Sequence, residues 1–201
     1  MTLLGLTAEA LLDRFASSDP TPGGGSAAAW AGATGAALVV MVCSMPKTRT
    51  GSEEERERLA TALGWAREGA ERLRRLVDDD TLAYDSVVAA YRLPKASESD
   101  RVARSEAIRT AMNHATEVPL ATAEACLVVL RAAGIAATHG NPNALSDARS
   151  AGALAWAGLT GAAENVKINT AGKAEAAGFR ERIEALEAEA RTELDALGLG
   201  A

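Results

Sequence analysis

The sequence has few aromatic residues and almost no runs of β-branched residues, the residue types that favour β-strands. Only 3% of the 201 residues are Phe, Trp or Tyr, whereas the helix formers Ala, Leu, Glu and Arg are abundant. No segment shows a convincing strand pattern. We therefore predict an all-α protein, a multi-helix bundle with long central helices that forms one domain over residues 1–201.

Cysteine and histidine are also scarce. Cys43 and Cys126 lie in apolar runs, lack the spacing of metal ligands and follow no signal peptide, so we expect no disulfide, no zinc and a cytoplasmic location. His114 and His139 have no acidic or nucleophilic partner at an informative spacing, which argues against a histidine-based triad. There is no Glu-x-x-His pair of the kind found in di-iron bundles.

The sequence has fewer basic than acidic residues. It also contains one long segment without any charged residue. The 27 acidic and 21 basic residues give a net charge of −6, which argues against a nucleic-acid partner. Because residues 21–46 are uncharged, a membrane span has to be considered. This segment is rich in Ala and Gly rather than in Leu, Ile and Phe, and it stands alone, so we expect a buried central helix and no membrane association.

Apolar residues recur in steps of four and three from Leu59 to Tyr91, which is the spacing of one face of a long packed helix. On this face Asp80 takes a place where a leucine would be expected. A carboxylate in such a seam has a raised pKa or a basic partner. Pairing with an Arg or Lys, or a helix break at 78–80, remains possible at this point, but we favour a functional carboxylate with Tyr84 one turn further on. The ten positions are Leu59, Leu63, Ala66, Ala70, Leu73, Val77, Asp80, Tyr84, Val87 and Tyr91.

Three glycines, Gly23 to Gly25, stand directly before Ser26, which is a suitable cap for a helix over 27–45. A glycine run at a helix N-terminus exposes backbone N–H groups to which a carboxylate or phosphate can bind. We therefore expect this loop to belong to a ligand site, and a passive linker is the alternative.

Further helices are expected at residues 7–15, 52–93, 97–139, 143–163 and 179–197. Pro119 falls inside one of them, where it should kink or divide the helix and free a carbonyl near Ala115. Asp147 and Asn165 lie eighteen residues apart on one helix. Because this separation is about 27 Å, the two residues cannot serve one site within one subunit.

Small residues dominate two helices of similar sequence. The segment AWAGATGAA at 29–37 is nearly repeated as AWAGLTGAA at 155–163, either as a low-complexity coincidence or because the two helices take similar positions. Their glycines would let helices approach closely, and one domain has limited interior. We therefore expect at least one of these helices at a subunit contact, in a homodimer or higher homo-oligomer. The glycines are Gly32, Gly35, Gly158 and Gly161.

Three stretches of the sequence stand out together: PGGGS at 22–26, residues 78–95 ending in YRLPK, and Gly140–Asn141 with Ser146–Asp147 and NVKIN at 165–169. In this order they resemble the cyclodeaminase/cyclohydrolase family, which comprises the C-terminal domain of formiminotransferase-cyclodeaminase and stand-alone methenyltetrahydrofolate cyclohydrolases. The resemblance covers roughly residues 4–189 and implies an all-α bundle, a tetrahydrofolate substrate, no metal or bound cofactor, and a homodimer or larger assembly.

The implied activity is that of a formimidoyltetrahydrofolate cyclodeaminase, which forms 5,10-methenyltetrahydrofolate and ammonia, and/or a methenyltetrahydrofolate cyclohydrolase. Both reactions pass through a tetrahedral carbon between two nitrogens and involve a delocalised cation that a buried carboxylate would stabilise. We expect catalytic roles for Asp80, Asp147 and Tyr84. The alternative is a non-catalytic helical module that binds folate or acts as an adaptor.

Substrate binding needs acceptors for the amino and amide donors of the pterin edge, and cations for the glutamate tail of folate. Asp147 is the candidate for the pterin edge, although a first-turn aspartate is also favoured by the helix dipole alone. Lys47 and Arg49 are further candidates for the tail. The expected binding residues are Gly23, Gly24, Gly25, Ser26, Asp78, Tyr91, Arg92, Lys95, Asn141, Asn165 and Asn169.

Overall fold

The computed structural model describes residues 2–200, apart from the side chain of Glu175. This part of the chain contains helices and no strand, which confirms the all-α prediction. The α-helices are α1 (Ala8–Ala16), α2 (Gly24–Cys43), α3 (Glu53–Tyr91), α4 (Glu98–His139), α5 (Leu145–Thr170) and α6 (Ala177–Ala196). Short 3₁₀ turns are η1 (Leu3–Gly5), η2 (Pro142–Ala144) and η3 (Ala174–Ala176).

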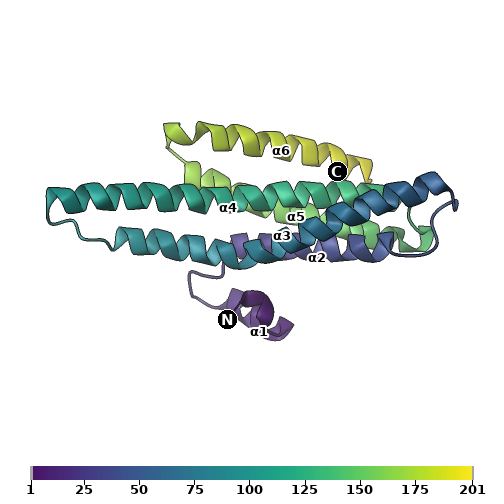
Figure 1. The fold of residues 1–201 in the computed structure, drawn as a ribbon, viewed down its shortest axis with the longest axis horizontal. Helices are drawn as coiled ribbons and strands as arrows, with labels where there is room; N and C mark the ends of the chain where they lie inside the picture. Colours follow the sequence, from purple (N-terminus) through teal and green to yellow (C-terminus); the bar gives the residue numbers. More distant parts are fainter. Residues whose placement is uncertain (1, 201) are drawn as a thin grey trace.

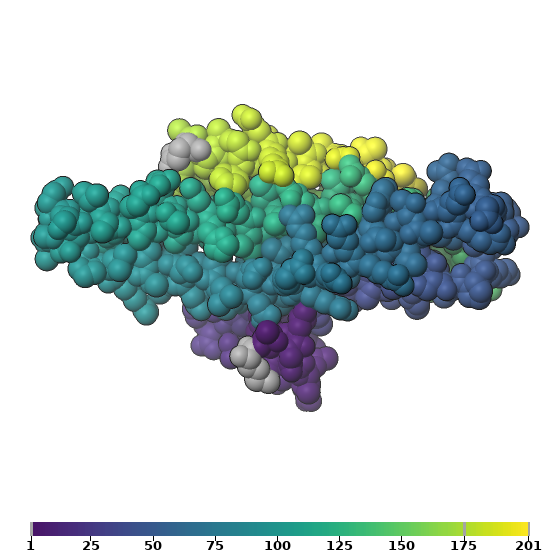
Figure 2. All heavy atoms as spheres, in the orientation of Figure 1, coloured from purple at the N-terminus to yellow at the C-terminus, as the bar shows by residue number. Residues whose placement is uncertain are grey.

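The two longest helices, α3 and α4, form an antiparallel hairpin that runs the length of the molecule (Figure 1). They contain 39 and 42 residues, which corresponds to about 58 and 63 Å. Helix α6 lies along the outer side of this bundle, whereas α1 lies on the opposite side. The turn between α3 and α4 projects beyond the other helices at one end (Figure 2).

Two of the predicted helix starts are confirmed by their capping contacts. The Thr7 hydroxyl accepts a hydrogen bond from Ala10 N at the start of α1, and Ser97 and Asp100 form a reciprocal capping box at the start of α4. The prediction for Ser26 was wrong. Helix α2 begins at Gly24, so Ser26 is its third residue and not its cap.

Helices α2 and α5 pack closely through glycine. A Cβ atom at Gly158 would lie 2.7 Å from the Ala28 carbonyl oxygen, and one at Gly35 would lie 2.7 Å from the Ala151 carbonyl oxygen. The two similar segments therefore pack against each other within one chain. Because this contact already accounts for the glycines, they no longer argue for a subunit contact, and assembly stays a prediction.

The buried face of α3 departs from the predicted face after Asp80. Ala83 and Ala90 are buried there, whereas Tyr84 and Tyr91 are 42% and 53% exposed. The reason is that α2 starts beside Asp80, so beyond this point α3 packs mainly on α4, and no other helix among residues 2–200 covers its opposite face (Figure 1).

Helices α2 and α4 are long and apolar enough to cross a membrane by length and composition alone. However, 56% and 61% of their apolar windows are buried inside the bundle, as in the core helices of soluble proteins. Cys126 belongs to this core, and burial raises the pKa of its thiol to about 12, so the thiol is neutral. Cys43 and Cys126 are both free.

Candidate active site

Asp80 of α3 meets the N-terminal end of α2. Its Oδ2 accepts hydrogen bonds from the backbone N–H of Ser26 (2.8 Å) and from the Ser26 hydroxyl (3.0 Å). The first turn of a helix has N–H groups without acceptors in its own helix, and Gly23, which precedes α2, has no side chain to supply one. Asp80 therefore supplies from another helix the acceptor that a capping residue normally provides.

Burial raises the pKa of Asp80 above its ordinary value, because desolvation disfavours the charged carboxylate. The two hydrogen bonds from Ser26 oppose this shift without cancelling it. The raised pKa was expected from the helix pattern, but its cause is partly different. Val77 is fully buried as predicted, whereas Tyr84 is 42% exposed, and the start of α2 at Gly25 packs directly against the Asp80 carboxylate.

Gly25 is needed for this arrangement because of its small size. A Cβ atom at position 25 would overlap both carboxylate oxygens of Asp80. At Gly24 the nearest side-chain atom to such a Cβ would be Asn165 Nδ2 at 3.9 Å, an ordinary contact distance. The two glycines therefore differ: Gly25 admits the carboxylate, and Gly24 is open to the cavity.

A cavity of about 340 Å³ opens in front of Asp80, a volume within the range of small-molecule sites. It brings together residues from the glycine loop and from α3, α4 and α5. Seven predicted site residues line it: Gly23, Gly24, Gly25, Asp80, Tyr84, Asn165 and Asn169. Within residues 2–200, no group of three His, Cys, Asp or Glu residues is placed to hold a metal ion.

The two asparagines of this cavity are fixed by their amide groups. Asn165 Nδ2 donates to the Gly161 carbonyl at 3.0 Å, and Asn169 Nδ2 donates to the Ala115 carbonyl at 2.8 Å. The second bond fulfils the prediction for Pro119, since a proline at this position removes the N–H that would otherwise bond to Ala115. Helix α4 nevertheless continues undivided through Pro119.

Residues 7–189 match the family model of formiminotransferase-cyclodeaminase. The chain belongs to this family. It is 44% identical over 185 residues to a methenyltetrahydrofolate cyclohydrolase from Methylorubrum extorquens, an alignment that covers 90% of this chain and 87% of the relative.

Two further relatives carry the cyclodeaminase name. The formimidoyltransferase-cyclodeaminase of Sus scrofa is 33% identical over 88% of this chain, which spans about a third (33%) of that longer protein. The crystal structure of formiminotetrahydrofolate cyclodeaminase from Thermotoga maritima aligns with a TM-score of 0.82 at 25% identity, covering 96% of this chain and 93% of that one.

Two predicted site residues, Asp147 and Asn141, lie at the end of the α2–α5 pair opposite to Asp80. Helix α5 runs antiparallel to α2, so Asp147 lies beyond the position of Gly35, more than about 13 Å along α2 from Ser26. Asn141 lies at the same end, and its side chain accepts a hydrogen bond from Asn143 N. Within one chain neither residue lines the cavity at Asp80, and Asp147 is separated from Asn165 as the eighteen-residue spacing predicted.

Four other predicted residues do not line this cavity. Asp78 accepts a hydrogen bond from Leu3 N at 2.6 Å, which ties the N-terminal segment to α3. Tyr91 and Arg92 line neighbouring cavities, and Lys95 is exposed beyond the end of α3.

The two tail candidates near residue 48 are far from the cavity. The Arg49 guanidinium donates to the Ala137 and Thr138 carbonyls at the C-terminal end of α4. Lys47 follows the end of α2, the end opposite to Asp80. Met112 and Ala115 also line the cavity, although the sequence did not predict them as site residues. The free carbonyl that Pro119 predicts near Ala115 was the only feature of the sequence that pointed to this part of the wall.

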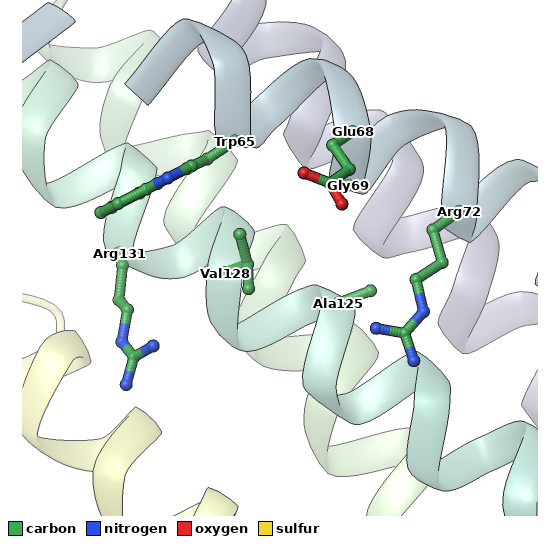
Figure 3. Close-up of a pocket in the computed structure, with 7 residues that line it drawn as sticks. All are labelled: Trp65, Glu68, Gly69, Arg72, Ala125, Val128 and Arg131. Carbon is green, nitrogen blue, oxygen red and sulfur yellow. The ribbon is translucent and has the colours of Figure 1, made fainter. Parts of the chain in front are cut away.

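A separate cavity of about 260 Å³ lies between α3 and α4 (Figure 3). Its arginines already have carboxylate partners, because Arg72 pairs with Glu124 at 2.9 Å and Arg131 pairs with Glu189. None of the predicted site residues lines it. The cavity at Asp80 is therefore the better candidate for chemistry. The lining residues are Trp65, Glu68, Gly69, Arg72, Ala125, Val128 and Arg131.

Proposed function

We propose that this protein is a methenyltetrahydrofolate cyclohydrolase with its reaction centre at Asp80. The observation that carries the proposal is a partly buried carboxylate of raised pKa, fixed by Ser26 at the wall of a small-molecule cavity. The 44% identity to a cyclohydrolase over nearly the whole chain supports the same reaction.

The substrate suits an anionic group at this position. In 5,10-methenyltetrahydrofolate the reacting carbon lies between two nitrogens and shares a delocalised positive charge, which an ionised carboxylate in a low-dielectric site would stabilise. Both hydrogen bonds from Ser26 go to Oδ2. We therefore assign Oδ1, which has no donor among the described residues, to the substrate and its attacking water.

Hydrolysis needs a base and then an acid. Asp80 would accept a proton from water as the oxygen bonds to the methenyl carbon, which gives a neutral tetrahedral intermediate. One carbon–nitrogen bond then breaks as the hydroxyl of the intermediate loses its proton and becomes the formyl carbonyl, and the departing nitrogen takes up the proton held by Asp80. The hydroxyl proton is the one released overall. The Tyr84 hydroxyl, one turn along α3 in the same cavity, is the candidate to position the water.

The walls of the cavity suit the pterin ring. Each asparagine uses its amide N–H₂ within the protein, so the amide oxygens of Asn165 and Asn169 are the groups that can accept bonds from pterin donors. Gly23 and Gly24 leave space for a flat ring to approach the backbone.

Cyclodeamination is the second candidate reaction. The structural similarity to the Thermotoga maritima cyclodeaminase favours it. In this reaction nitrogen 10 attacks the formimino carbon and ammonia leaves, which again requires a tetrahedral carbon and a proton transfer. The same carboxylate serves either reaction.

The test is an absorbance assay with 5,10-methenyltetrahydrofolate and, separately, with 5-formiminotetrahydrofolate, each corrected for its spontaneous rate. Asp80→Asn should lower kcat about 100-fold or more, since the base is lost while the acceptor for Ser26 N–H is kept. Asp79→Asn removes the same charge one residue away, outside the cavity lining, and serves as the matched control.

Two results would contradict the proposal. The wild-type protein would convert both substrates only at the spontaneous rate, as expected for a non-catalytic module. Alternatively, Asp80→Asn would keep the wild-type kcat, which would remove Asp80 from the chemistry.

A further inference from the structure

A second cavity of about 620 Å³ adjoins the cavity at Asp80 and shares Met112 and Asn169 with it. Its walls come from α4, from the ends of α3 and α5, and from the turn that leads to α6. Because Met112 and Asn169 line both cavities, the two cavities lie next to each other. The other lining residues are Tyr91, Ser105, Ile108, Arg109, Asn113, Thr116, Lys173, Ala176 and Phe179.

The two cavities differ in charge. The charged group that lines the first cavity is the Asp80 carboxylate. The second is lined by the cations Lys173 and Arg109, and none of its described lining residues is acidic. The two adjacent cavities therefore suit a molecule that is cationic at one end and anionic at the other.

Lys173 is held in place by the turn after α5. Gly172 has a φ of +70°, a left-handed conformation that favours glycine, and it lets the chain reverse directly after Thr170. The Arg180 guanidinium donates to the Thr170 and Lys173 carbonyls, both at 2.9 Å. The Lys173 ammonium in turn donates to the Asn169 carbonyl at 2.7 Å, which leaves it further N–H donors for a ligand.

Aromatic residues from two different helices line the second cavity. Phe179 lies in the wall formed by α6, and Tyr91 lies in the wall formed by α3. The Arg104 guanidinium lies 5.5 Å above the Tyr91 ring and donates to the Tyr91 carbonyl, so this ring is held from outside. Aromatic walls of this kind bind a flat benzoyl ring.

We propose that the second cavity binds the aminobenzoyl-glutamate half of the folate, with its carboxylates at Lys173 and Arg109. The inference rests on the proposed function, because that function places the cationic one-carbon unit at Asp80. A methenyltetrahydrofolate carries its positive charge at the one-carbon bridge and its negative charges on the glutamate, which matches the order of charges along the two cavities. Asn165 and Asn169 are one helical turn apart, about 6 Å, and mark the direction from the first cavity to Lys173.

This assignment differs from the one based on sequence. Arg92 and Lys95 are exposed at the projecting tip of the α3–α4 hairpin, and neither is among the residues that line the second cavity. They are the competing positions for the tail, and the experiment has to include them.

The test is the affinity of 5-formyltetrahydrofolate, a stable ligand, compared with that of the same compound without its glutamate, both measured by titration calorimetry. Lys173→Met should lower the affinity for the glutamate-bearing ligand about tenfold, because a charge-assisted contact is lost. The same variant should bind the shortened ligand with unchanged affinity. Lys173→Arg should restore most of the affinity for the glutamate-bearing ligand. Arg109→Met should lower the affinity for the glutamate-bearing ligand only about two- to threefold, because Arg109 is exposed and already pairs with Glu106.

Arg67→Met, on the exposed face of α3 away from both cavities, is the charge-matched control. Equal weakening of both ligands by Lys173→Met, or a glutamate-specific loss in Lys95→Met instead, would overturn the assignment. If the wild type binds neither ligand, the assignment and the proposed function both fail. If binding is glutamate-dependent through Lys173 but neither substrate is turned over, only the proposed reaction fails.

Discussion

At the scale of single residues, the surroundings of Asp80 have two opposite effects on its pKa. Burial favours the neutral acid, whereas the Ser26 N–H and hydroxyl favour the carboxylate. Because the folded-state pKa is raised above the unfolded value, this group stabilises the fold at low pH and loses that contribution as the pH rises through the folded pKa. Its ionised form therefore costs stability, which is expected of a group kept for chemistry.

The position of Ser26 changes how Asp80 should be replaced. Leucine at position 80 would remove the buried charge, but it would leave the Ser26 N–H and hydroxyl without this acceptor, at a cost of about 1–3 kcal/mol for each buried group. Asparagine keeps an oxygen acceptor and removes only the charge. The interpretation of Asp80 as a helix-face position alone did not include this second role.

We predict that kcat/KM falls as the pH is lowered through the raised pKa of Asp80, because the carboxylate form is the base and the partner of the cationic substrate. The loss should be centred above the ordinary aspartate value of about 4. Initial rates across a pH series, corrected for the spontaneous reaction at each pH, give the profile. A profile that stays flat down to pH 4 would show that Asp80 is not the titrating base.

Gly25 should be more sensitive than Gly24, although the sequence treats them alike. Gly25→Ala places a methyl group where the Asp80 carboxylate lies, so we expect kcat to fall about 100-fold with the loss of the base. Gly24→Val adds bulk in the open cavity, so we expect KM to rise about tenfold while kcat changes little. Steady-state kinetics on both variants separates the two effects. Equal losses of kcat would contradict the distinction.

At the scale of helices, the sequence predicted the elements better than their contacts. Helix starts at Thr7 and Ser97 and the free carbonyl at Ala115 follow from local chemistry, so they were predictable. The exposure of Tyr84 and Tyr91 was not, because it depends on where α2 begins relative to α3. The acceptor at Ser26 comes from a residue 54 positions away, which no local pattern contains.

The cationic cavity was missed for a similar reason. Lys173 lies in a turn after α5, whereas Arg109 lies on the exposed side of α4. Neither residue belongs to a periodic pattern or a motif, and only the packing of α4 against the end of α5 brings them to one cavity. Arg92 and Lys95 were predicted as binding residues instead, because they belong to the YRLPK stretch that resembles the family.

The bond between Asn169 and the Ala115 carbonyl links α4 to α5 at the wall of the site. We predict that Asn169→Ala lowers the free energy of unfolding by about 1–3 kcal/mol, because the carbonyl freed by Pro119 loses its partner. In a Pro119→Ala background the backbone N–H returns and satisfies this carbonyl, so the same Asn169 change should cost less. Denaturant titrations of the four proteins measure this coupling. Equal costs in both backgrounds would show that Asn169 does not serve the Ala115 carbonyl.

At the scale of the whole molecule, two residues expected in one site lie at opposite ends of the α2–α5 pair. Asp80 adjoins the start of α2, whereas Asp147 lies toward its end. Helix α2 also exposes an uncharged row on its outer face, Thr34, Ala37 and Met41, with Met41 39% exposed. A two-fold axis near the middle of this row would bring the Asp147 end of one subunit to the Asp80 end of the other.

We therefore predict that the protein forms a dimer whose sites combine Asp80 of one subunit with Asp147 of the other. Asp80→Asn and Asp147→Asn should each be nearly inactive as pure proteins, because each loses one carboxylate from both sites. Co-refolding equal amounts should recover about a quarter of the wild-type activity, since half of the dimers are mixed and each mixed dimer holds one intact site. Light scattering at micromolar concentration tests the dimer independently. A mixture that remains as inactive as its components would confine each site to one chain.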